Sequence, residues 1–335
     1  MHSMSVLQPI GDDAAVFVPS AGTIAVTTDL MAEGVHFDLA YTSPYALGFK
    51  LVSVNVSDIM AMGVAARYLF LNVGIKRESE LSFFDAFFDG IAAACERYGI
   101  ALLGGDMSGV RHDLFVSATV IGEGTRFVAR KGAHPGDNIY VTGCLGDSAC
   151  GLAVLQKLNS AGQRAVLENT SCIKPAQGDV FLAIGMENVP WGDVEPLLMR
   201  HLMPTARSSA AIAPYASAMI DISDGLFIDV SRLCDESGVG AEVWAASLPL
   251  SSSLCGIAPL LGKDALTFAV AGGEDYELLF TSSAPPAELH RASSDVPITC
   301  IGVVTDAERA FVVVDGMRQP LVPQGYDHFR AEQQS

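Results

Sequence analysis

Positive charge is scarce in this sequence. Lys and Arg together number 20 against 38 Asp and Glu, which gives a formal net charge of −18 at pH 7. A surface this acidic repels the phosphate backbone of nucleic acids and the head groups of anionic membranes. We therefore expect neither nucleic acid nor a membrane as a partner.

Paired cysteines and long apolar runs are lacking as well. The seven cysteines are scattered and form no Cys-x-x-Cys pair, which excludes zinc ribbons and thioredoxin-like motifs and favours reduced, buried thiols. No apolar run approaches the ~20 residues of a membrane span. Asp12 and Asp13 interrupt the apolar N-terminal stretch, so it does not resemble a signal peptide. These features predict a cytoplasmic protein.

The chain is long and apolar enough for two domains. It has 335 residues, of which 50% are hydrophobic, and a domain typically takes about 100–200 residues. The turn-forming stretch at 130–137 changes the texture of the sequence, and we place the boundary there, with domains at 1–134 and 135–335. Strands and helices mix in both halves without strict β-α-β alternation, which favours an α+β fold.

Local patterns predict the individual elements. In the first half we expect a strand at 23–28, a helix at 44–62, a helix capped by Ser79 or Ser82 and ended by Gly99, and strands at 101–103 and 114–122. In the second half we expect helices at 147–158 and 224–236, and strands at 139–142, 219–222, 266–271, 276–281, 298–304 and 310–314.

The carboxylates are distributed in an informative way. Acidic residues recur at expected strand ends and helix starts, flanked by glycine or hydroxyl residues, around Asp13, Asp29, Asp58, Asp106, Asp221, Asp224 and Glu274. A single Asp in such a place is most often a helix cap or a turn residue. Six such places together indicate a functional site.

Electrostatics suggests what that site holds. Two carboxylates ~4 Å apart repel by about 4 kcal/mol at an effective dielectric constant of 20, so several can share a site only when protonated or bridged by cations. Oxygen ligands without paired His or Cys favour Mg²⁺ or Mn²⁺ over zinc, and magnesium in acidic loops usually serves a phosphate substrate. Helical spacing would bring Asn55 and Asp58 to one face, although this could be an ordinary polar face.

Other candidate residues have structural explanations of equal weight. The glycine-rich turn at 143–151 opens a helix and could receive a phosphate on its N–H groups, or it could simply pack tightly. Arg130 could contact a phosphate or lie on the surface, and His36 could bind a substrate or be a structural histidine. No Gly-x-Ser-x-Gly motif is present, so nucleophilic hydrolase chemistry is not indicated.

Taken together, the motifs resemble the thiamine-monophosphate kinase family, whose superfamily also contains aminoimidazole ribonucleotide synthetase and selenophosphate synthetase. The matching stretches run in order along nearly the whole chain: GDDAAV at 11–16, TTDLMAEGVHF at 27–37, KLVSVNVSDIMAMG at 50–63, LLGGDMS at 102–108, RKGAHPGDNIYVTGCLGDSACGL at 130–152, MIDISDGLFIDV at 219–230, GGEDYELLF at 272–280 and GYDHF at 325–329. Only ten residues precede Gly11, fewer than this family usually carries, so we expect an edge of the fold or part of the ATP pocket to differ.

The resemblance implies a two-domain α+β protein whose N-terminal sheet pairs with that of a second subunit in a homodimeric barrel. It implies ATP and several Mg²⁺ ions as ligands. Residues implied as metal ligands are Asp13, Thr27, Thr28, Asp29, Asp58, Asp106, Asp221 and Asp224. Implied nucleotide contacts are Gly105, Asp106, Arg130, Ser223 and Phe88, the last standing where relatives often have Tyr. The implied pocket for thiamine monophosphate contains His36, Glu274 and Tyr326.

The implied activity is ATP-dependent phosphorylation of thiamine monophosphate to thiamine diphosphate by direct in-line transfer, with no residue acting as acid or base. Alternatives are another ATP-dependent synthetase of the superfamily, a two-metal phosphoester hydrolase, or a non-catalytic dimer stabilised by metal.

Overall fold

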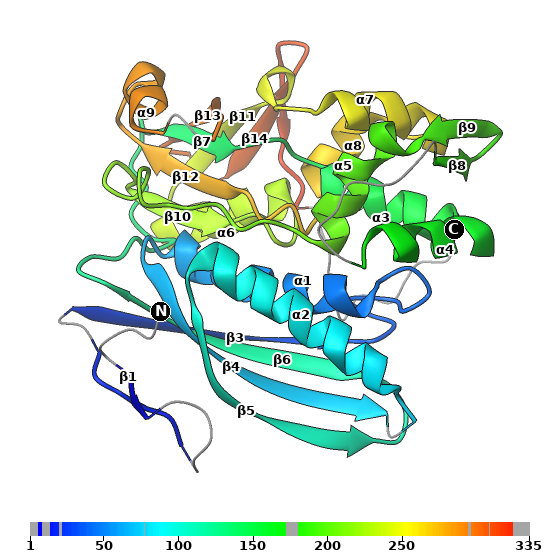
Figure 1. The fold of residues 1–335 in the computed structure, drawn as a ribbon. Coiled ribbons are helices and arrows are strands. Elements are labelled where there is room, and N and C mark those ends of the chain that lie inside the picture. Colours follow the sequence, from blue (N-terminus) through cyan, green and yellow to red (C-terminus); the bar gives the residue numbers. More distant parts are fainter. Residues whose placement is uncertain are drawn as a thin grey trace. The chain divides into compact units, whose positions relative to one another are not determined.

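The computed structural model describes residues 6–8, 14–19, 22–76, 78–171, 180–293, 296–307 and 309–323. The chain divides into two compact units, the first formed by residues 1–128, 155–192 and 202–213 and the second by residues 129–154, 193–201 and 214–335. Both have mixed α/β content (Figure 1). The predicted boundary between residues 134 and 135 stays a prediction. The helices α3 (Asp147–Lys157) and α5 (Trp191–Leu202) each contribute residues to both units.

The first unit is built on a four-stranded sheet in the order β3-β6-β4-β5, with β3 and β5 at its edges. Its strands are β3 (Thr23–Ala32), β4 (Ala65–Lys76), β5 (Ala101–Val110) and β6 (Phe115–Gly124). The pair β4–β5 is parallel, and β3–β6 and β4–β6 are antiparallel. The helices α1 (Pro44–Ala61) and α2 (Leu81–Tyr98) cover one face of this sheet (Figure 1).

Helix α1 begins and ends where its sequence predicts. Ser43 caps it by accepting a hydrogen bond from the N–H of Ala46, and Pro44 takes the first helical position. The helix packs closely on α2 because both carry a glycine at the crossing. A Cβ on Gly48 would lie 2.1 Å from the carbonyl oxygen of Phe87, so a larger residue would force the two helices apart.

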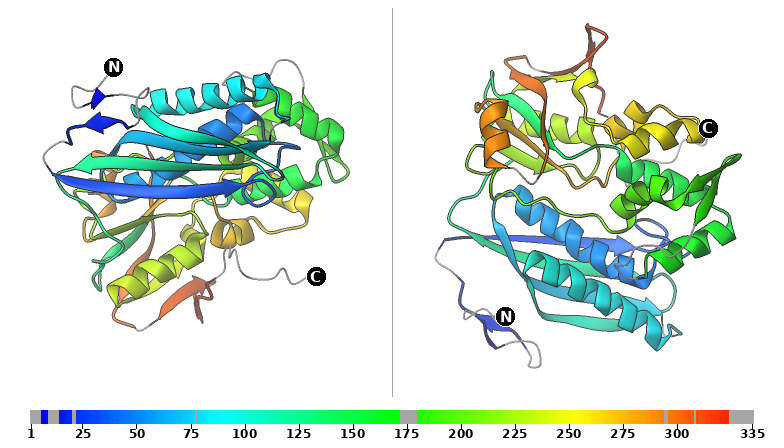
Figure 2. Two further views of the ribbon diagram at one scale, coloured as in Figure 1. Left: turned by 90° about the horizontal axis from the view of Figure 1, so that it is seen from below. Right: turned by 45° about the horizontal axis from the view of Figure 1, so that its top comes forward.

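Among the described residues of the first unit, no helix covers the other face of the sheet (Figure 2). Ile24, Val26 and Leu30 of β3 are 46%, 62% and 56% exposed. Because side chains alternate along a strand, Thr27 and Asp29 point to the helix-covered face instead. The short strands β1 (Val6–Gln8) and β2 (Val16–Phe17) form a separate two-stranded antiparallel sheet. The Phe17 ring lies against that of Tyr68, with 4.6 Å between centroids and a tilt of 39°.

The second unit is built on a seven-stranded sheet in the order β10-β12-β7-β13-β11-β14-β15. The strands are β7 (Asn138–Thr142), β10 (Ala218–Asp221), β11 (Gly240–Trp244), β12 (Leu278–Ser282), β13 (Ile298–Thr305), β14 (Ala310–Val314) and β15 (Met317–Pro320). Helix α6 (Leu226–Ser237) buries Leu226, Val230 and Leu233 in a core shared with Ile220 and Val243 of the sheet.

The remaining elements are smaller. They are α4 (Ser160–Asn169), β8 (Phe181–Ile184), β9 (Glu187–Pro190), α7 (Ser252–Ile257), α8 (Ala265–Ala271), α9 (Pro286–Ala292) and the 3₁₀ turns η1 (Ala245–Ser247) and η2 (Ala258–Leu261). Among the described residues no single helix is long and apolar enough to cross a membrane, although the bent pair 252–261 and 265–271 meets that criterion by length and composition.

One predicted element type, one predicted helix cap and one predicted strand end are wrong. The expected strand at 266–271 is helix α8, which Asp264 caps by accepting a hydrogen bond from Leu266 N–H. Neither Ser79 nor Ser82 caps α2, whose N-cap is Glu80. The strand expected at 101–103 continues to Val110, so Gly105 and Asp106 lie within a strand rather than at its end.

Candidate functional site

Two carboxylates of the first unit approach each other between β3 and α1. Asp58 lies in the last turn of α1, and its Oδ2 accepts a hydrogen bond of 2.6 Å from the hydroxyl of Thr27 on β3. Two residues along the same strand, the backbone N–H of Asp29 donates to Oδ1 of Asn55, one turn before Asp58. Asn55 is fully buried and donates in turn to the carbonyl of Leu51. These bonds fix the end of α1 on the edge strand.

The electrostatics of this acid pair is unfavourable without a cation. Burial raises the pKa of Asp29 from 3.8 to about 6, and the neighbouring charge of Asp58 adds to the rise. A raised carboxyl pKa means that the surroundings disfavour the negative charge. With the hydroxyl of Thr27 nearby, the pair offers only oxygen ligands, the kind that Mg²⁺ prefers.

Thr28 points to the opposite face of the sheet. Its hydroxyl donates to the carbonyl oxygen of Ala118 at 3.0 Å and accepts from the hydroxyl of Thr119 at 3.2 Å. A contribution of Thr28 to a site beside Asp29 would therefore come from its backbone carbonyl rather than from its side chain.

Asp106 is not brought to the acid pair within one chain. It lies on the edge strand β5 and aligns with Asn72 of β4, which aligns with Ser117 of β6 and through it with Leu30 of β3. Three interstrand spacings separate Asp106 on β5 from Leu30 on β3, which puts Asp106 roughly 14 Å from β3. It also shares the helix-free face with Leu30, whereas Asp29 faces the helices.

Gly105 has a structural reason to be glycine. Its φ is +155°, and a Cβ there would lie 2.0 Å from the carbonyl oxygen of Leu71 on β4. Phe88, another predicted nucleotide contact, is half-buried on α2, where its ring meets that of Phe87 edge-on at 5.5 Å.

His36 closes the turn that follows β3. Its Nδ1 accepts a hydrogen bond of 3.1 Å from the N–H of Ala32. In the neutral ring the proton then resides on Nε2, which makes that nitrogen a donor. At the start of the same turn, Glu33 forms an ion pair of 2.8 Å with Lys76 and accepts from the N–H of Leu114.

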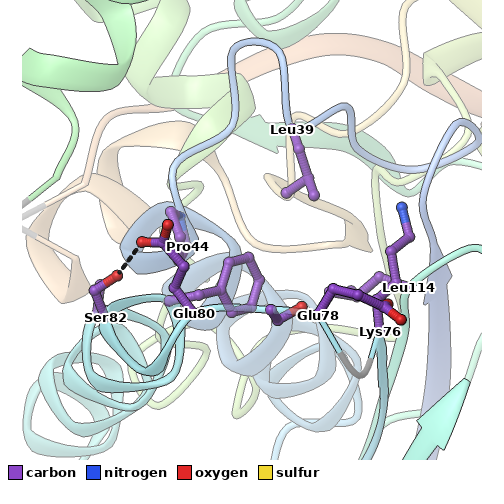
Figure 3. A pocket seen from close by; sticks show the side chains of 10 residues that line it. Leu39, Pro44, Lys76, Glu78, Glu80, Ser82 and Leu114 are labelled. Carbon is purple, nitrogen blue, oxygen red and sulfur yellow. Dashed lines mark hydrogen bonds between the residues drawn. The ribbon is translucent and has the colours of Figure 1, made fainter.

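A cavity of about 500 Å³ lies beside this ion pair (Figure 3). Its lining includes Leu39, Phe83 and Leu114, and also Glu80, which accepts a hydrogen bond from Ser82. The cavity adjoins the first residue of α1, whereas Asp58 lies fourteen residues further, roughly 21 Å along the helix. It is therefore separate from the acid pair.

In the second unit, Asp221 ends β10, and Ser223 and Asp224 follow it. Asp221 is 2% exposed. Asp224 forms an ion pair with Arg232 of α6, which also binds the fully buried Asp229 at 2.9 Å. A metal ion at Asp224 would therefore compete with an arginine. Arg130 is exposed, and its carbonyl accepts from Ser237.

Glu274 lies in the segment 272–277, which joins α8 to β12. Its backbone N–H donates to the carbonyl of Ser223 at 2.7 Å, so a predicted substrate contact and a predicted nucleotide contact are joined directly. Its carboxylate lies 3.2 Å from Nδ1 of His201.

Of the two alternatives for the glycine-rich turn, phosphate binding or tight packing, the structure favours packing for two of its amides. The N–H groups of Gly146 and Ser148 donate to the two carboxylate oxygens of Asp275, at 2.6 and 3.2 Å. Burial raises the pKa of Asp275 to about 7 even with these two donors. The chain itself thus supplies the anion that the turn binds.

Two predicted site residues, Asp13 and Tyr326, lie outside the described residues. Within the described residues, no group of three or more His, Cys, Asp or Glu side chains is placed to hold a metal ion. The structure therefore brings together Thr27, Asp29 and Asp58 in the first unit, and Asp221, Ser223, Asp224 and Glu274 in the second.

Sequence reasoning missed several contacts around these groups. Arg200, His201 and Arg232 belong to no recognisable motif. Arg200 and His201 pair with carboxylates more than 70 residues later in the chain, and Arg232 pairs with carboxylates one and two helical turns before it. Asp275 lies in the acidic stretch GGEDYE, which the sequence singled out. Its partners, the N–H groups of Gly146 and Ser148, are more than 120 residues earlier and could not be predicted from the local pattern.

Comparison with known proteins gives matches along nearly the whole chain. Residues 11–123 match the family AIR synthase related protein, N-terminal domain, and residues 134–315 match its C-terminal domain. The thiamine-monophosphate kinase of Aquifex aeolicus is 36% identical over 96% of this chain and 92% of its own length. That of Salmonella typhimurium is 37% identical, covering 96% and 91%.

Solved structures agree. The structure of AaThiL complexed with AMPPCP and TMP has a TM-score of 0.75 and 34% identity, covering 96% of this chain and 92% of that one. The thiamine-monophosphate kinase from Stenotrophomonas maltophilia has a TM-score of 0.78 and 35% identity, covering 94% and 92%. This chain therefore belongs to the thiamine-monophosphate kinase family, within the group of AIR synthase related proteins.

Proposed function

We propose that this protein transfers the γ-phosphoryl group of ATP to the phosphate of thiamine monophosphate, giving ADP and thiamine diphosphate. The observation that carries the proposal is the similarity along 96% of the chain to a structure complexed with AMPPCP and TMP. The acid pair of Asp29 and Asp58 supports it, because transfer between two anions needs positive charge that this chain lacks.

The chemistry requires little of the protein beyond placement. An oxygen of the substrate phosphate attacks the γ-phosphorus in line, the bond to the β-phosphate oxygen breaks, and ADP leaves. The attacking phosphate is already ionised at neutral pH, so no general base is needed. The residues of the chain hold the two phosphates in line and keep water away.

Magnesium is the cation that fits this donor set. Asp29 and Asp58 would hold one ion with the hydroxyl of Thr27 and a backbone oxygen at Thr28. Asp13, Asp106, Asp221 and Asp224 are the proposed ligands of further ions. When bound, magnesium would supply the charge that offsets the repulsion between the two phosphorylated substrates.

The remaining assignments concern the two substrates. We assign His36, Glu274 and Tyr326 to thiamine monophosphate, with the Nε2 proton of His36 as a donor. For ATP, Gly105, Asp106, Arg130, Ser223 and Phe88 are the assigned contacts. A location in the cytoplasm stays a prediction.

We also propose a homodimer formed through the helix-free face of the four-stranded sheet. Ile24, Val26, Leu30 and Phe115 on that face are 37–62% exposed, a row of apolar side chains that a second sheet would cover. Asp106 shares this face. Sedimentation at micromolar concentration tests the proposal, and Val26→Glu should give monomers.

An assay with purified protein, ATP, Mg²⁺ and thiamine monophosphate tests the function. ADP and thiamine diphosphate should form in equal amounts, and thiamine in place of its monophosphate should give neither. Release of inorganic phosphate without an acceptor would favour a phosphoester hydrolase, and ADP formation only with another acceptor would favour a different synthetase.

A further inference from the structure

The segment Gly272–Glu277 is held in an unusual conformation. It has no regular secondary structure, and Glu274 and Tyr276 have φ angles of 64° and 51°. Among the described residues, Asp315 is the one other non-glycine residue with positive φ. A left-handed non-glycine residue costs of the order of 1 kcal/mol, so the surroundings must hold the segment in place.

Two consecutive residues at the end of α5 supply part of that hold. Nη1 of Arg200 donates to the carbonyl of Asp275 at 3.2 Å and to Oε1 of Glu277 at 2.7 Å. Nδ1 of His201 lies 3.2 Å from Oε2 of Glu274. His201 is only 3% exposed and Glu277 is fully buried.

The other contacts of the segment come from β7, from the glycine-rich turn and from the residues that follow β10. Asp275 is bound by the amides of the glycine-rich turn, and Thr142 donates to Oε2 of Glu277 at 2.7 Å. The N–H of Tyr276 donates to the carbonyl of Ile222, between Asp221 and Ser223. Every residue from Glu274 to Glu277 is thus held by at least one hydrogen bond or ion pair.

We propose that Arg200 and His201 are positioning residues that orient the Glu274 carboxylate toward thiamine monophosphate. Arg200 fixes the backbone and the far end of the segment, and His201 fixes the carboxylate that the substrate meets. The inference rests on the proposed function, because it takes Glu274 as a substrate contact. Neither residue touches substrate.

Substitutions of His201 test the proposal more clearly than those of Arg200, because Arg200 also pairs with the buried carboxylate of Glu277. His201→Leu should raise the KM for thiamine monophosphate about tenfold, the loss expected for one polar contact with a charged group, and leave the KM for ATP within about twofold. His290→Leu is the matched control. His290 is exposed on α9, outside the segment, and its Nε2 lies 2.7 Å from the carbonyl oxygen of Ile298.

Rescue separates positioning from a general structural role. In His201→Asn the side-chain amide stands close to the position of Nδ1, whereas in His201→Gln it stands closer to that of Nε2. We expect Asn to keep a KM for thiamine monophosphate nearer to the wild type than Gln does. This comparison also serves if His201→Leu does not fold, and the reverse order would overturn the proposal.

The outcomes distinguish this proposal from the function itself. A wild-type protein that makes no thiamine diphosphate contradicts the proposed function. An active wild type combined with an unchanged His201→Leu, or with equal rises in both KM values, contradicts only the positioning role.

Discussion

The hydroxyl of Thr27 donates to the carboxylate of Asp58 at 2.6 Å, which joins the edge strand β3 to the last turn of α1. The bond matters because Asp29, two residues further along the strand, reaches the same helix through Asn55. Two carboxylates that repel each other are thereby fixed side by side by the backbone and by neutral side chains. An arrangement that stores repulsion in this way is suited to receive a cation.

Replacing either carboxylate should therefore stop the reaction without unfolding the protein. Asp29→Asn and Asp58→Asn each remove one charge from the pair and should lower the turnover of thiamine monophosphate by about 100-fold or more, the effect typical of losing a charge-stabilising group. ADP formation with saturating substrates measures it, and circular dichroism checks the fold.

Asp89→Asn is the matched control for these two variants. Asp89 is exposed on α2, so the same change in charge occurs away from the pair. The control should retain full activity. Near-normal turnover in Asp29→Asn or Asp58→Asn would contradict the metal assignment.

The raised pKa of Asp29 predicts a pH dependence of stability. The folded pKa is about 6 and the ordinary value is 3.8, so the native state binds this proton more tightly than the unfolded chain does. Protonated Asp29 therefore adds to the free energy of unfolding below about pH 4. This contribution, up to about 3 kcal/mol, is lost as the pH rises through 6. In EDTA, Asp29→Asn should thus become more stable relative to the wild type between pH 4.5 and 7.5.

Urea unfolding of both proteins at the two pH values checks this difference. Magnesium added at pH 7.5 should then stabilise the wild type more than the variant, because a ligand of the native state adds to its stability. A relative stability that moves the other way with pH would show that the charge of Asp29 is not disfavoured in the fold.

The sequence predicted Asp29 and Asp58 as members of one larger acidic site, because the signals that begin and end the strand and the helix around them are strong. Pro44 and the glycine at position 63 bracket α1, and helical spacing placed Asn55 and Asp58 on one face, where the structure has them. What the sequence did not reveal is that Asn55 binds backbone rather than presenting its amide to a ligand.

Other expectations failed where local pattern and tertiary context disagree. The apolar run at 266–271 suits a strand or a helix equally, and the cap at Asp264 decides for the helix. The glycines before Asp106 suggested a strand end, but the strand continues because β4 pairs with it as far as Val110. The sequence predicted that Asp106 would share a site with Asp29, but within one chain the two residues lie on opposite edge strands of the sheet.

Arg232 is expected to stabilise the second unit through its ion pairs with Asp224 and Asp229, which no sequence motif predicts. It pairs with Asp224 and with the buried Asp229, whose carboxylate also accepts the N–H groups of residues 224 and 225. Arg232→Met keeps the aliphatic stem but leaves Asp229 without its cation. We expect a loss of about 1–3 kcal/mol, less than for a fully buried pair because the Arg232 side chain is 40% exposed.

Urea unfolding measures this loss, with Arg291→Met as the control, since Arg291 is exposed on α9. The double variant Arg232→Met with Asp229→Asn should recover much of the stability because the unpaired charge is gone. A single variant as stable as the wild type, or no recovery in the double variant, would mean that the pair contributes little.

Gly105 offers a prediction that separates a structural role from a nucleotide contact. Its φ is +155°, and a Cβ at this position would approach the carbonyl oxygen of Leu71 to 2.0 Å, which leaves no room for a side chain. Gly105→Ala should therefore destabilise the first unit by about 2 kcal/mol or more, whether or not ATP binds there.

The neighbouring glycine is a close control. A Cβ on Gly104 would meet only the Phe70 ring, at 3.4 Å, which is an ordinary contact. Gly104→Ala should thus cost far less stability than Gly105→Ala in urea unfolding. If Gly105→Ala instead unfolds like the wild type but binds ATP weakly, the glycine is required for the nucleotide and not for the strand, because only a ligand would then sense the added methyl group.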